Sequence, residues 1–339
     1  MKNKTKYLLA LIVALFLLVI IVFAVAHNKK SVASSSKKDS YVLKLSDANV
    51  LCDAPEEIAA AKGFFKDEGL KYTVSKLSAS TTNIEAIESG KIDAGVSLLP
   101  SVVQPLSNGA QFKITTGLHT GCLSILVPQN SPIKNAQDLK GKSIGVSSVA
   151  GDDANFARTY LTQNGLNVNG NKSDVNFIAY DGSELPIALQ KGQVAAIAEY
   201  DPETQILEQK DNFKVLASSS STAPFNTEIC CVAYVSDKLA KEHPEIAKKY
   251  TRALQKAAAW VSKHQEEAVK IQIEQHYVAG TQDVNLKALD MYHWKASYKD
   301  GASAFKTVAK DLQKTGALSK DINVPALAKN SLLKLTNVK

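Results

Sequence analysis

Cysteine and histidine are the residue types that most readily build metal sites and nucleophilic centres, and this chain has four cysteines and six histidines. The cysteines are Cys52, Cys122, Cys230 and Cys231, and none belongs to a CxxC pair. Each lies in an apolar or strand-like stretch, where a cysteine is typically a small buried hydrophobic residue. One optional disulfide is the main alternative. No metal site is expected, because no pair of histidines has ligand spacing together with a third partner.

Common catalytic motifs are absent from the sequence. It contains no GxSxG, no HExxH, no Walker-type glycine loop, and no GxGxxG placed after a strand. The sequence therefore contains none of these indications of an enzyme. No catalytic residue and no cofactor are expected.

An uncharged apolar run, Tyr7 to Ala26, follows three lysines near the start of the chain. About 20 apolar residues are needed to cross a membrane as a helix, and flanking lysines tend to remain inside. Ala24, Val25 and Ala26 also form a small-x-small signal-peptidase site. Both interpretations, a membrane anchor and a cleaved signal, place the rest of the chain outside the cytoplasmic membrane.

The net charge of +7 comes almost entirely from the first 40 residues, which hold seven lysines and one aspartate. The remaining residues carry 33 basic and 32 acidic side chains, or a net charge of +1. Because these charges are interspersed, a nucleic-acid partner is not expected.

From Val42 onward, short strand-like runs alternate with helical runs. The helix expected at 152–164 is ended by Gly165, and the helix expected at 184–191 by Gly192, since glycine readily adopts the left-handed conformation past a helix end. Strands and helices that alternate at a spacing of about 10 to 15 residues predict βαβ units, with parallel sheets covered by helices on both faces. The fold class is therefore α/β.

Two apolar strands, in CLSILVPQNSP and in EICCVAYVSD, are long enough to pass from one domain to another. Cys122 lies on the first crossing strand and the Cys230-Cys231 pair on the second, so side chains from the two strands are expected to meet. Whether Cys122 forms a disulfide with Cys230 or Cys231 stays open. We therefore expect two doubly wound α/β lobes joined by two crossing strands. The expected divisions are a signal or anchor (1–26), a polar tether (27–41), lobe 1 (42–122 plus 232–339) and lobe 2 (123–231).

Several segments resemble a known family when they are taken in order. They are IAAAKGFFKDEGLKYTV (58–74), IESGKIDAGVS (87–97), DLKGKSIGV (138–146), ALQKGQVAAI (188–197) and HPEIAKKYTRALQKAAAWV (243–261). Together they resemble the nitrate/sulfonate/taurine-type (NitT/TauT) substrate-binding proteins of ABC importers. The resemblance implies a periplasmic-binding type II fold that closes on a small solute, works as a monomer, and has permease and ATPase subunits as partners.

In such sheets, ligands bind at the carboxyl ends of the strands. Loops at these ends, and the helix starts that follow them, can hold acceptor atoms of a solute through free backbone N–H groups. The candidate ligand-binding residues selected in this way are Cys52, Asp53, Ser80, Thr81, Thr82, Ser97, Leu98, His119, Thr120, Gly151, Asp152, Glu199 and Asp201.

Two alternatives stay open for these residues. Ser80, Thr81, Thr82 and Asp152 also suit ordinary helix N-capping. His119 ends a strand beside the first crossing strand, where it could equally donate to a ligand or be a buried structural histidine.

The candidate loops are acidic, with Glu56 and Glu57 where the family usually has apolar or aromatic residues. Buried carboxylates require donors or positive partners. These loops therefore favour an amine-bearing or heteroaromatic solute, such as a pyrimidine, over an inorganic anion. The acids could also serve only their helix dipoles.

Two rival functions share the expected fold. One is an enzyme similar to thiamine-pyrimidine synthases or to small lyases of menaquinone routes, although ICCVAY lacks the triple cysteine of the synthases. The other is a membrane-tethered solute sensor.

Overall fold

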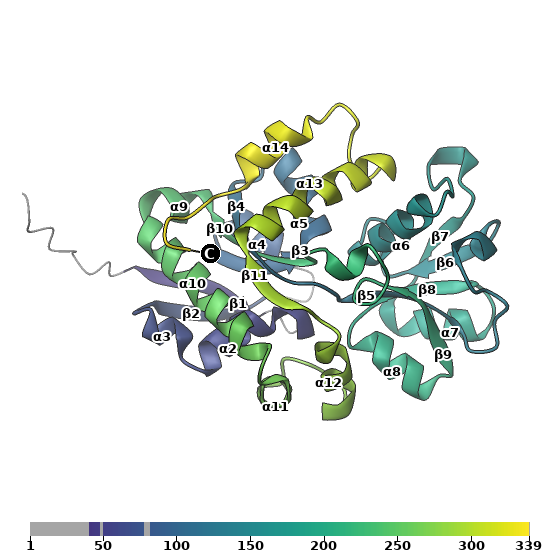
Figure 1. Ribbon diagram of the computed structural model, residues 1–339, viewed down its shortest axis with the longest axis horizontal. Helices are drawn as coiled ribbons and strands as arrows, with labels where there is room; N and C mark the ends of the chain where they lie inside the picture. The colour runs from purple at the N-terminus through teal and green to yellow at the C-terminus, as the bar shows by residue number, and fades with distance from the viewer. Residues whose placement is uncertain (1–40, 48–49, 78–81, 339) are drawn as a thin grey trace, which may run out of the picture. The chain divides into compact units, whose positions relative to one another are not determined.

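The computed structural model describes residues 41–47, 50–77 and 82–338 (Figure 1). Within these ranges, none of the helices combines the length and apolar character that a membrane crossing requires. The expected span at 7–26 lies outside the described residues.

Two sheets organise the described chain. The first has the order β11-β4-β10-β3, and a parallel pair, β1 and β2, adjoins it through a hydrogen bond of 2.8 Å from the Asp93 N–H to the Lys44 carbonyl. The second has the order β7-β6-β8-β5-β9. The strands of the first group are β1 (Val42–Asp47), β2 (Lys71–Lys76), β3 (Ala94–Leu98), β4 (Phe112–His119), β10 (Cys231–Ser236) and β11 (Trp294–Ser297). Those of the second are β5 (Leu123–Pro128), β6 (Ser143–Val146), β7 (Asn176–Ala179), β8 (Ala196–Tyr200) and β9 (Phe213–Ser218).

Helices cover both faces of each sheet (Figure 1). On the first group they are α2 (Ala54–Ala61), α3 (Phe64–Asp67), α4 (Asn83–Glu88), α5 (Leu99–Ser107), α9 (Asp237–Glu242), α10 (Pro244–Val261), α11 (Gln265–Glu274), α12 (Gln282–Asp290), α13 (Tyr298–Lys314) and α14 (Val324–Ser331). On the second sheet they are α6 (Asp152–Gln163), α7 (Leu185–Gln190) and α8 (Glu203–Lys210). Short 3-10 turns are η1 (Leu51–Asp53), η2 (Ala136–Leu139), η3 (Gly170–Lys172), η4 (Gly182–Glu184) and η5 (Phe225–Thr227).

Glycines end two of the expected helices as the sequence pattern indicates. Gly165 follows α6 with φ +84°, and Gly192 follows α7 with φ +68°. A residue with a Cβ is strained in this left-handed region, so glycine is the favoured stop.

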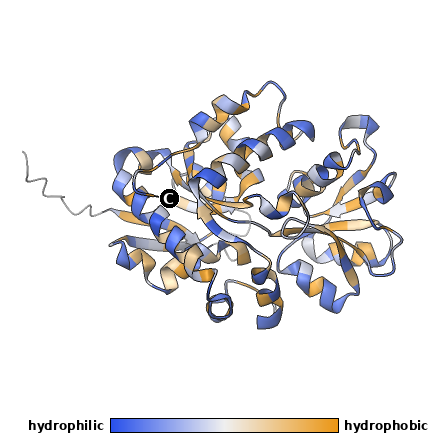
Figure 2. Cartoon of the chain, viewed as in Figure 1, coloured by the Kyte–Doolittle hydropathy of each residue, from blue (hydrophilic) through white to orange (hydrophobic). Residues whose placement is uncertain are grey.

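Apolar residues are frequent on the strands, and the helices carry both apolar and polar residues (Figure 2). Buried apolar side chains pack between each sheet and its helices. Leu43 and Tyr250 belong to one core on the first sheet, and Phe112 and Phe305 belong to the core on its other face. The second sheet has its own pair of cores. The two sheets are therefore stabilised largely independently.

Two short segments connect the sheets. Residues 120–122 lead from β4 to β5, and residues 219–230 lead from β9 to β10. The sequence pattern predicted parallel sheets, and this is wrong for the strands that follow these segments: β5 runs antiparallel to β8 and β9, and β10 runs antiparallel to β3 and β4. Each enters its new sheet at the edge where the neighbouring strands end, since Cys231 pairs with both Leu98 and His119. A strand that starts at that edge must run the opposite way.

A contact between two glycines fixes how α13 packs on β4. A Cβ placed on Gly301 would lie 2.6 Å from the backbone nitrogen of Gly117 and 3.0 Å from its Cα. Real Cβ atoms do not approach backbone this closely, so the helix or the strand would have to move.

We predict that Gly301→Ala lowers the free energy of unfolding by about 1–3 kcal/mol, because overpacking displaces the helix from the strand. Alanine is favoured over glycine in a helix by about 1 kcal/mol. A net loss of stability in Gly301→Ala would therefore come from the steric clash with Gly117. Gly182→Ala is the matched control, because no atom lies within 4 Å of its added Cβ. Urea unfolding measures both variants, and equal stability of the two would contradict the packing argument.

Candidate functional site

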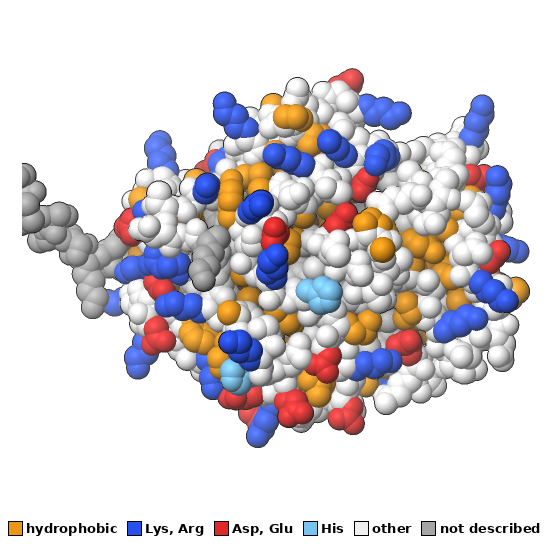
Figure 3. Space-filling model, viewed as in Figure 1, with side chains coloured by type: hydrophobic (Ala, Val, Ile, Leu, Met, Phe, Trp, Pro, Cys, Tyr) orange, Lys and Arg blue, Asp and Glu red, His pale blue; other side chains and the backbone are white. Residues whose placement is uncertain are grey.

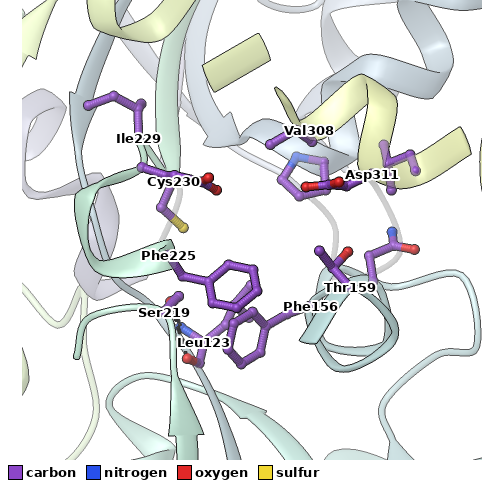
Figure 4. A pocket seen from close by; sticks show the side chains of 13 residues that line it. Leu123, Phe156, Thr159, Ser219, Phe225, Ile229, Cys230, Val308 and Asp311 are labelled. Atoms are coloured by element: carbon purple, nitrogen blue, oxygen red, sulfur yellow. Dashed lines mark hydrogen bonds between the residues drawn. The ribbon is translucent and has the colours of Figure 1, made fainter. Parts of the chain in front are cut away.

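A pocket lies where α6 of the second sheet faces α13 of the first (Figure 4). Asn155, Phe156 and Thr159 line it from α6, and Val308 and Leu312 line it from α13. Side chains that belong to both sheets therefore surround one space.

The second connecting segment completes the wall with Ser219, Phe225 and Cys230. The rings of Phe156 and Phe225 meet edge to face, with centroids 5.1 Å apart and planes at 74°. Figure 4 shows the two rings beside each other and the Cys230 thiol pointing toward them. The cavity volume is about 70 Å³, less than the roughly 150 Å³ of an engineered cavity that binds benzene. In this arrangement the pocket has room for a small substituent or a few waters.

The charged side chains described in the lining of this pocket, Glu228 and Asp311, are both acidic. Among the described residues that line it, none is a lysine, arginine or histidine. Asn155 is buried, and its Oδ1 has no hydrogen-bond partner among the described atoms. Asp311 already accepts hydrogen bonds from Gln163 Nε2 at 3.3 Å and Lys314 Nζ at 2.7 Å. The lining therefore offers little to bind an anion.

Asp152 lies on the same face of α6 as the pocket residues, at the N-terminal end of the helix. It precedes Asn155, Phe156 and Thr159 by three, four and seven positions, the spacing of neighbours on one helix face. It is 8% exposed, and its Oδ1 is buried without a partner among the described atoms. Burial raises the pKa of Asp152 to about 7, assisted by the nearby Cys230, while a hydrogen bond from Ser101 opposes the shift. A donor or a cation placed here would satisfy this carboxyl group.

Two carboxyl groups, those of Asp152 and Asp153, lie at the N-terminus of α6. Gly151 is the N-cap residue, and no side chain caps the helix there. Asp153 accepts hydrogen bonds from the backbone N–H of Ser147 at 2.6 Å and from its hydroxyl at 2.8 Å. Since Asp152 and Asp153 both lie in the first turn, they complement the helix dipole. An incoming anion would lie beside two carboxyl groups.

Two further predicted residues, Glu199 and Asp201, lie at and just beyond the end of β8. Burial raises the pKa of Glu199 to about 8, with Glu203 and Asp153 adding to the shift, and its Oε1 has no partner among the described atoms. Burial also raises the pKa of Asp201 to about 6. Asp201 accepts hydrogen bonds at 3.0 Å from both Gln205 Nε2 and the Tyr292 hydroxyl. Asp201 therefore links the second sheet to Tyr292, which precedes β11 of the first sheet.

His119 and Cys52 come together beside the first connecting segment. His119 is fully buried, with Nε2 lying 2.8 Å from the Cys52 carbonyl and Nδ1 lying 3.0 Å from the Thr120 carbonyl. Its ring stacks on Tyr292 at 5.1 Å. The Thr120 hydroxyl accepts a hydrogen bond from the His293 N–H at 3.1 Å. These contacts are intramolecular, and a solute contact by His119 or Thr120 stays a prediction.

The remaining predicted residues occupy different surroundings. The Thr82 side chain caps α4 in a capping box with Glu85, as the alternative interpretation expected. Ser97 and Leu98 end β3, and Leu98 packs against apolar cores of both sheets. Asp53 is buried at the start of α2, where burial raises its pKa well above its usual range. Ser80 and Thr81 lie outside the described residues.

Sequence reasoning missed the pocket itself, since none of its described lining residues was among the predicted contacts. Only Cys230 had been singled out, for its expected proximity to Cys122. That proximity is confirmed, since the two Sγ atoms lie 3.2 Å apart, and all four cysteines are free thiols. Nothing in the amphipathic pattern of α13 distinguished pocket residues from core residues.

The buried carboxyl of Asp152 gives stability a specific pH dependence. Its pKa is about 7 in the folded chain and about 4 when unfolded. The folded state therefore binds more protons between these values, and stability falls as pH rises from about 4 to 7.

We predict that Asp152→Asn is more stable than the unmodified chain by a few kcal/mol at pH 8, and equally stable near pH 4. This follows because one pKa unit corresponds to about 1.4 kcal/mol. Urea unfolding at several pH values measures the difference. Asp283→Asn, an exposed first-turn acid of α12, is the matched control and should show no pH-dependent gain. A loss of stability at every pH in the Asp152 variant would contradict the argument.

Comparisons with known proteins agree with this architecture. A family model described as NMT1/THI5 like matches residues 54–268. A putative aliphatic sulfonates-binding protein of Bacillus subtilis (strain 168) is 26% identical over 264 residues, which cover 76% of each chain. A putative thiamine biosynthesis protein of Haemophilus influenzae (strain ATCC 51907 / DSM 11121 / KW20 / Rd) is 29% identical over 141 residues, covering 41% of this chain and 43% of that protein.

The fold is also that of a solved binding protein. The periplasmic aliphatic sulphonate binding protein SsuA from Escherichia coli superimposes with a TM-score of 0.71 at 16% identity, covering 88% of this chain and 94% of that chain. The expected α/β periplasmic-binding fold is therefore confirmed, as is the family resemblance. Since the family match spans more than half of the sequence, the chain belongs to the NMT1/THI5-like family.

Proposed function

We propose that this chain is the extracytoplasmic solute-binding component of an ABC importer. It binds one small organic solute that carries hydrogen-bond donors, such as an amine or an aminopyrimidine, and presents it to a permease whose ATPase subunits drive transport. The protein works as a monomer, held at the outer face of the cytoplasmic membrane by its N-terminal segment or released after cleavage. It catalyses no reaction.

Solute capture would use two lobes, formed by residues 42–122 with 232–339 and by residues 123–231. Each lobe contains one of the two sheets, and only two segments connect them. Contacts between the lobes include Lys287 to Glu208 at 2.8 Å and Asn169 Nδ2 to the Lys314 carbonyl at 2.7 Å. Because the pocket between α6 and α13 is too small for a complete solute, the lobes must part to admit one. Contacts of the solute with both lobes would then favour the closed form.

The solute class rests on one observation, the buried and unpartnered carboxyl oxygen of Asp152, a residue on the face of α6 that lines the apolar pocket. A donor group of the solute would pair with this oxygen, and its apolar part would contact Phe156 and Phe225. Sulfonate, the solute class named for the Bacillus and Escherichia relatives, would instead meet the carboxyl groups of Asp152 and Asp153. The relative named for thiamine biosynthesis favours a pyrimidine, since thiamine contains an aminopyrimidine ring.

The surface does not favour a nucleic-acid partner. On the face shown in Figure 3, basic and acidic side chains are interspersed over both sheets' helices. Nucleic-acid binding proteins typically gather basic residues on one face. A small solute and the importer subunits are the partners that we propose.

We predict that an aminopyrimidine or a primary amine raises the melting temperature of the full chain, while nitrate and an alkanesulfonate do not, because a ligand that binds only the folded form stabilises it by mass action. Asp152→Asn should weaken binding of the stabilising compound by about 10-fold or more, since a charge-assisted hydrogen bond contributes roughly 1.5–3 kcal/mol. Thermal-shift screening followed by calorimetry gives both results.

Asp283→Asn again serves as the control and should bind with unchanged affinity. Recovery of the compound intact after incubation separates a receptor from an enzyme on the same fold. Stabilisation by the sulfonate, strengthened in Asp152→Asn, would overturn the proposed solute class.

A further inference from the structure

All four cysteines of the chain converge at the junction of the two sheets. Cys52 lies in η1, Cys122 in the first connecting segment, Cys230 at the end of the second, and Cys231 at the start of β10. They are separated by up to 179 positions in the sequence, and no CxxC spacing signals their meeting. The sequence predicted the meeting of Cys122 with the Cys230-Cys231 pair, and the fold adds Cys52 to this cluster.

The sulfur atoms have the spacing of metal ligands. The Sγ atoms of Cys52, Cys122 and Cys231 all lie within 4.8 Å of one another, and those of Cys122 and Cys231 are 3.6 Å apart. A tetrahedral zinc ion with Zn–S bonds of about 2.3 Å holds its sulfurs about 3.8 Å apart. Shifts of about 1 Å or less would bring these three thiols to that geometry.

We propose that Cys52, Cys122 and Cys231 bind one thiophilic cation of the Zn²⁺ or Cu⁺ class, with Cys230 as the adjacent fourth thiol. The three sulfurs are soft ligands, which select such ions over Ca²⁺ and Mg²⁺. Each of the three residues is buried, with 6%, 2% and 0% of its surface exposed respectively. The ion would stabilise the fold, because its three ligands come from separate parts of the chain.

The backbone at Cys122 supports a role for its thiol. Its φ is +94°, in a region that a residue with a Cβ occupies at a cost of roughly 1–3 kcal/mol. Glycine at position 122 would avoid this strain. Cysteine is therefore an advantage there only if its sulfur makes a stabilising or binding interaction. The Cys122 sulfur lies next to those of Cys230 and Cys231, at 3.2 and 3.6 Å.

Binding of a cation at this cluster would release protons. Thiolates are the form that binds metals, so an ion would displace the protons of the thiols that bind it. The Cys52 thiol lies 4.0 Å from the Asp53 carboxyl oxygen, which can accept its hydrogen bond while no ion is bound.

A bound ion would tie three separate parts of the chain together. These are the turn before α2, the first segment that connects the sheets, and the start of β10. The proposal does not depend on which solute the chain binds, or on whether it binds one.

The test uses the full chain, reduced and freed of metal, and titrated with Cd²⁺, Zn²⁺ and Cu⁺. We expect one equivalent of each ion to bind, with a thiolate-to-metal charge-transfer absorption in the ultraviolet for Cd²⁺. Ca²⁺ and Mg²⁺ should not bind at this site. Absence of the charge-transfer band, or no bound ion after gel filtration, overturns the proposal without the use of any variant.

Two variants then assign the ligands. Cys122→Ser should abolish the charge-transfer band, while the matched control, Cys230→Ser, should retain one bound equivalent. Circular dichroism verifies that each variant folds. Retention of the band in Cys122→Ser would contradict the assignment.

The main competing outcome is a disulfide between Cys122 and Cys230, formed with loss of two protons and transfer of two electrons to a disulfide oxidant. Peptide mass mapping without reductant would detect it. If the reduced chain binds no ion and this disulfide forms instead, the cluster is a redox pair and the metal proposal is wrong.

Discussion

Carboxyl groups that are buried without basic partners constrain what can occupy the junction between the two sheets. Asp53, Asp152, Glu199 and Asp201 are each at most 8% exposed, and within the described part of the chain no lysine or arginine forms an ion pair with any of them. Isolated charges are expensive to bury, so these groups favour their neutral forms or a ligand that donates to them. The junction therefore favours groups that donate hydrogen bonds. The two similar binding proteins described above are instead named for sulfonate, which is an anion.

The same junction also carries the two chain segments that connect the sheets. Only residues 120–122 and 219–230 connect the sheets, and the strands that follow these segments pair antiparallel to their neighbours. The connections therefore enter each sheet at the edge where the other strands end, beside Asp152, His119 and the cysteines. A small rotation about them would change the space between α6 and α13 while each apolar core stays intact.

Much of the fold could be predicted from local pattern. Alternating apolar runs identified the strands, and Gly165 and Gly192 marked helix ends because glycine tolerates a positive φ there. The meeting of Cys122 with Cys230 followed once two crossing strands were recognised. Antiparallel pairing of β5 and β10 could not be predicted, since direction depends on the edge at which a strand enters a sheet and leaves no trace in its own residues.

The candidate site was predicted only in part. Asp152 was identified because it begins a helix after a strand, a local feature. Val308 and Leu312 were not, because an apolar residue on an amphipathic helix looks the same whether it faces a core or a pocket. Thr82 was chosen by the same local rule as Asp152 and caps its own helix, so helix position alone does not separate a capping residue from a binding residue.

A crystal structure of the full chain with a bound aminopyrimidine would show which group pairs with Asp152. We expect a ring nitrogen or amine within about 3 Å of the Asp152 carboxyl group, with the ring against Phe156 and Phe225 and both lobes in contact with the solute. A ligand held by one lobe only, or one that leaves the Asp152 oxygen unpartnered, would contradict it.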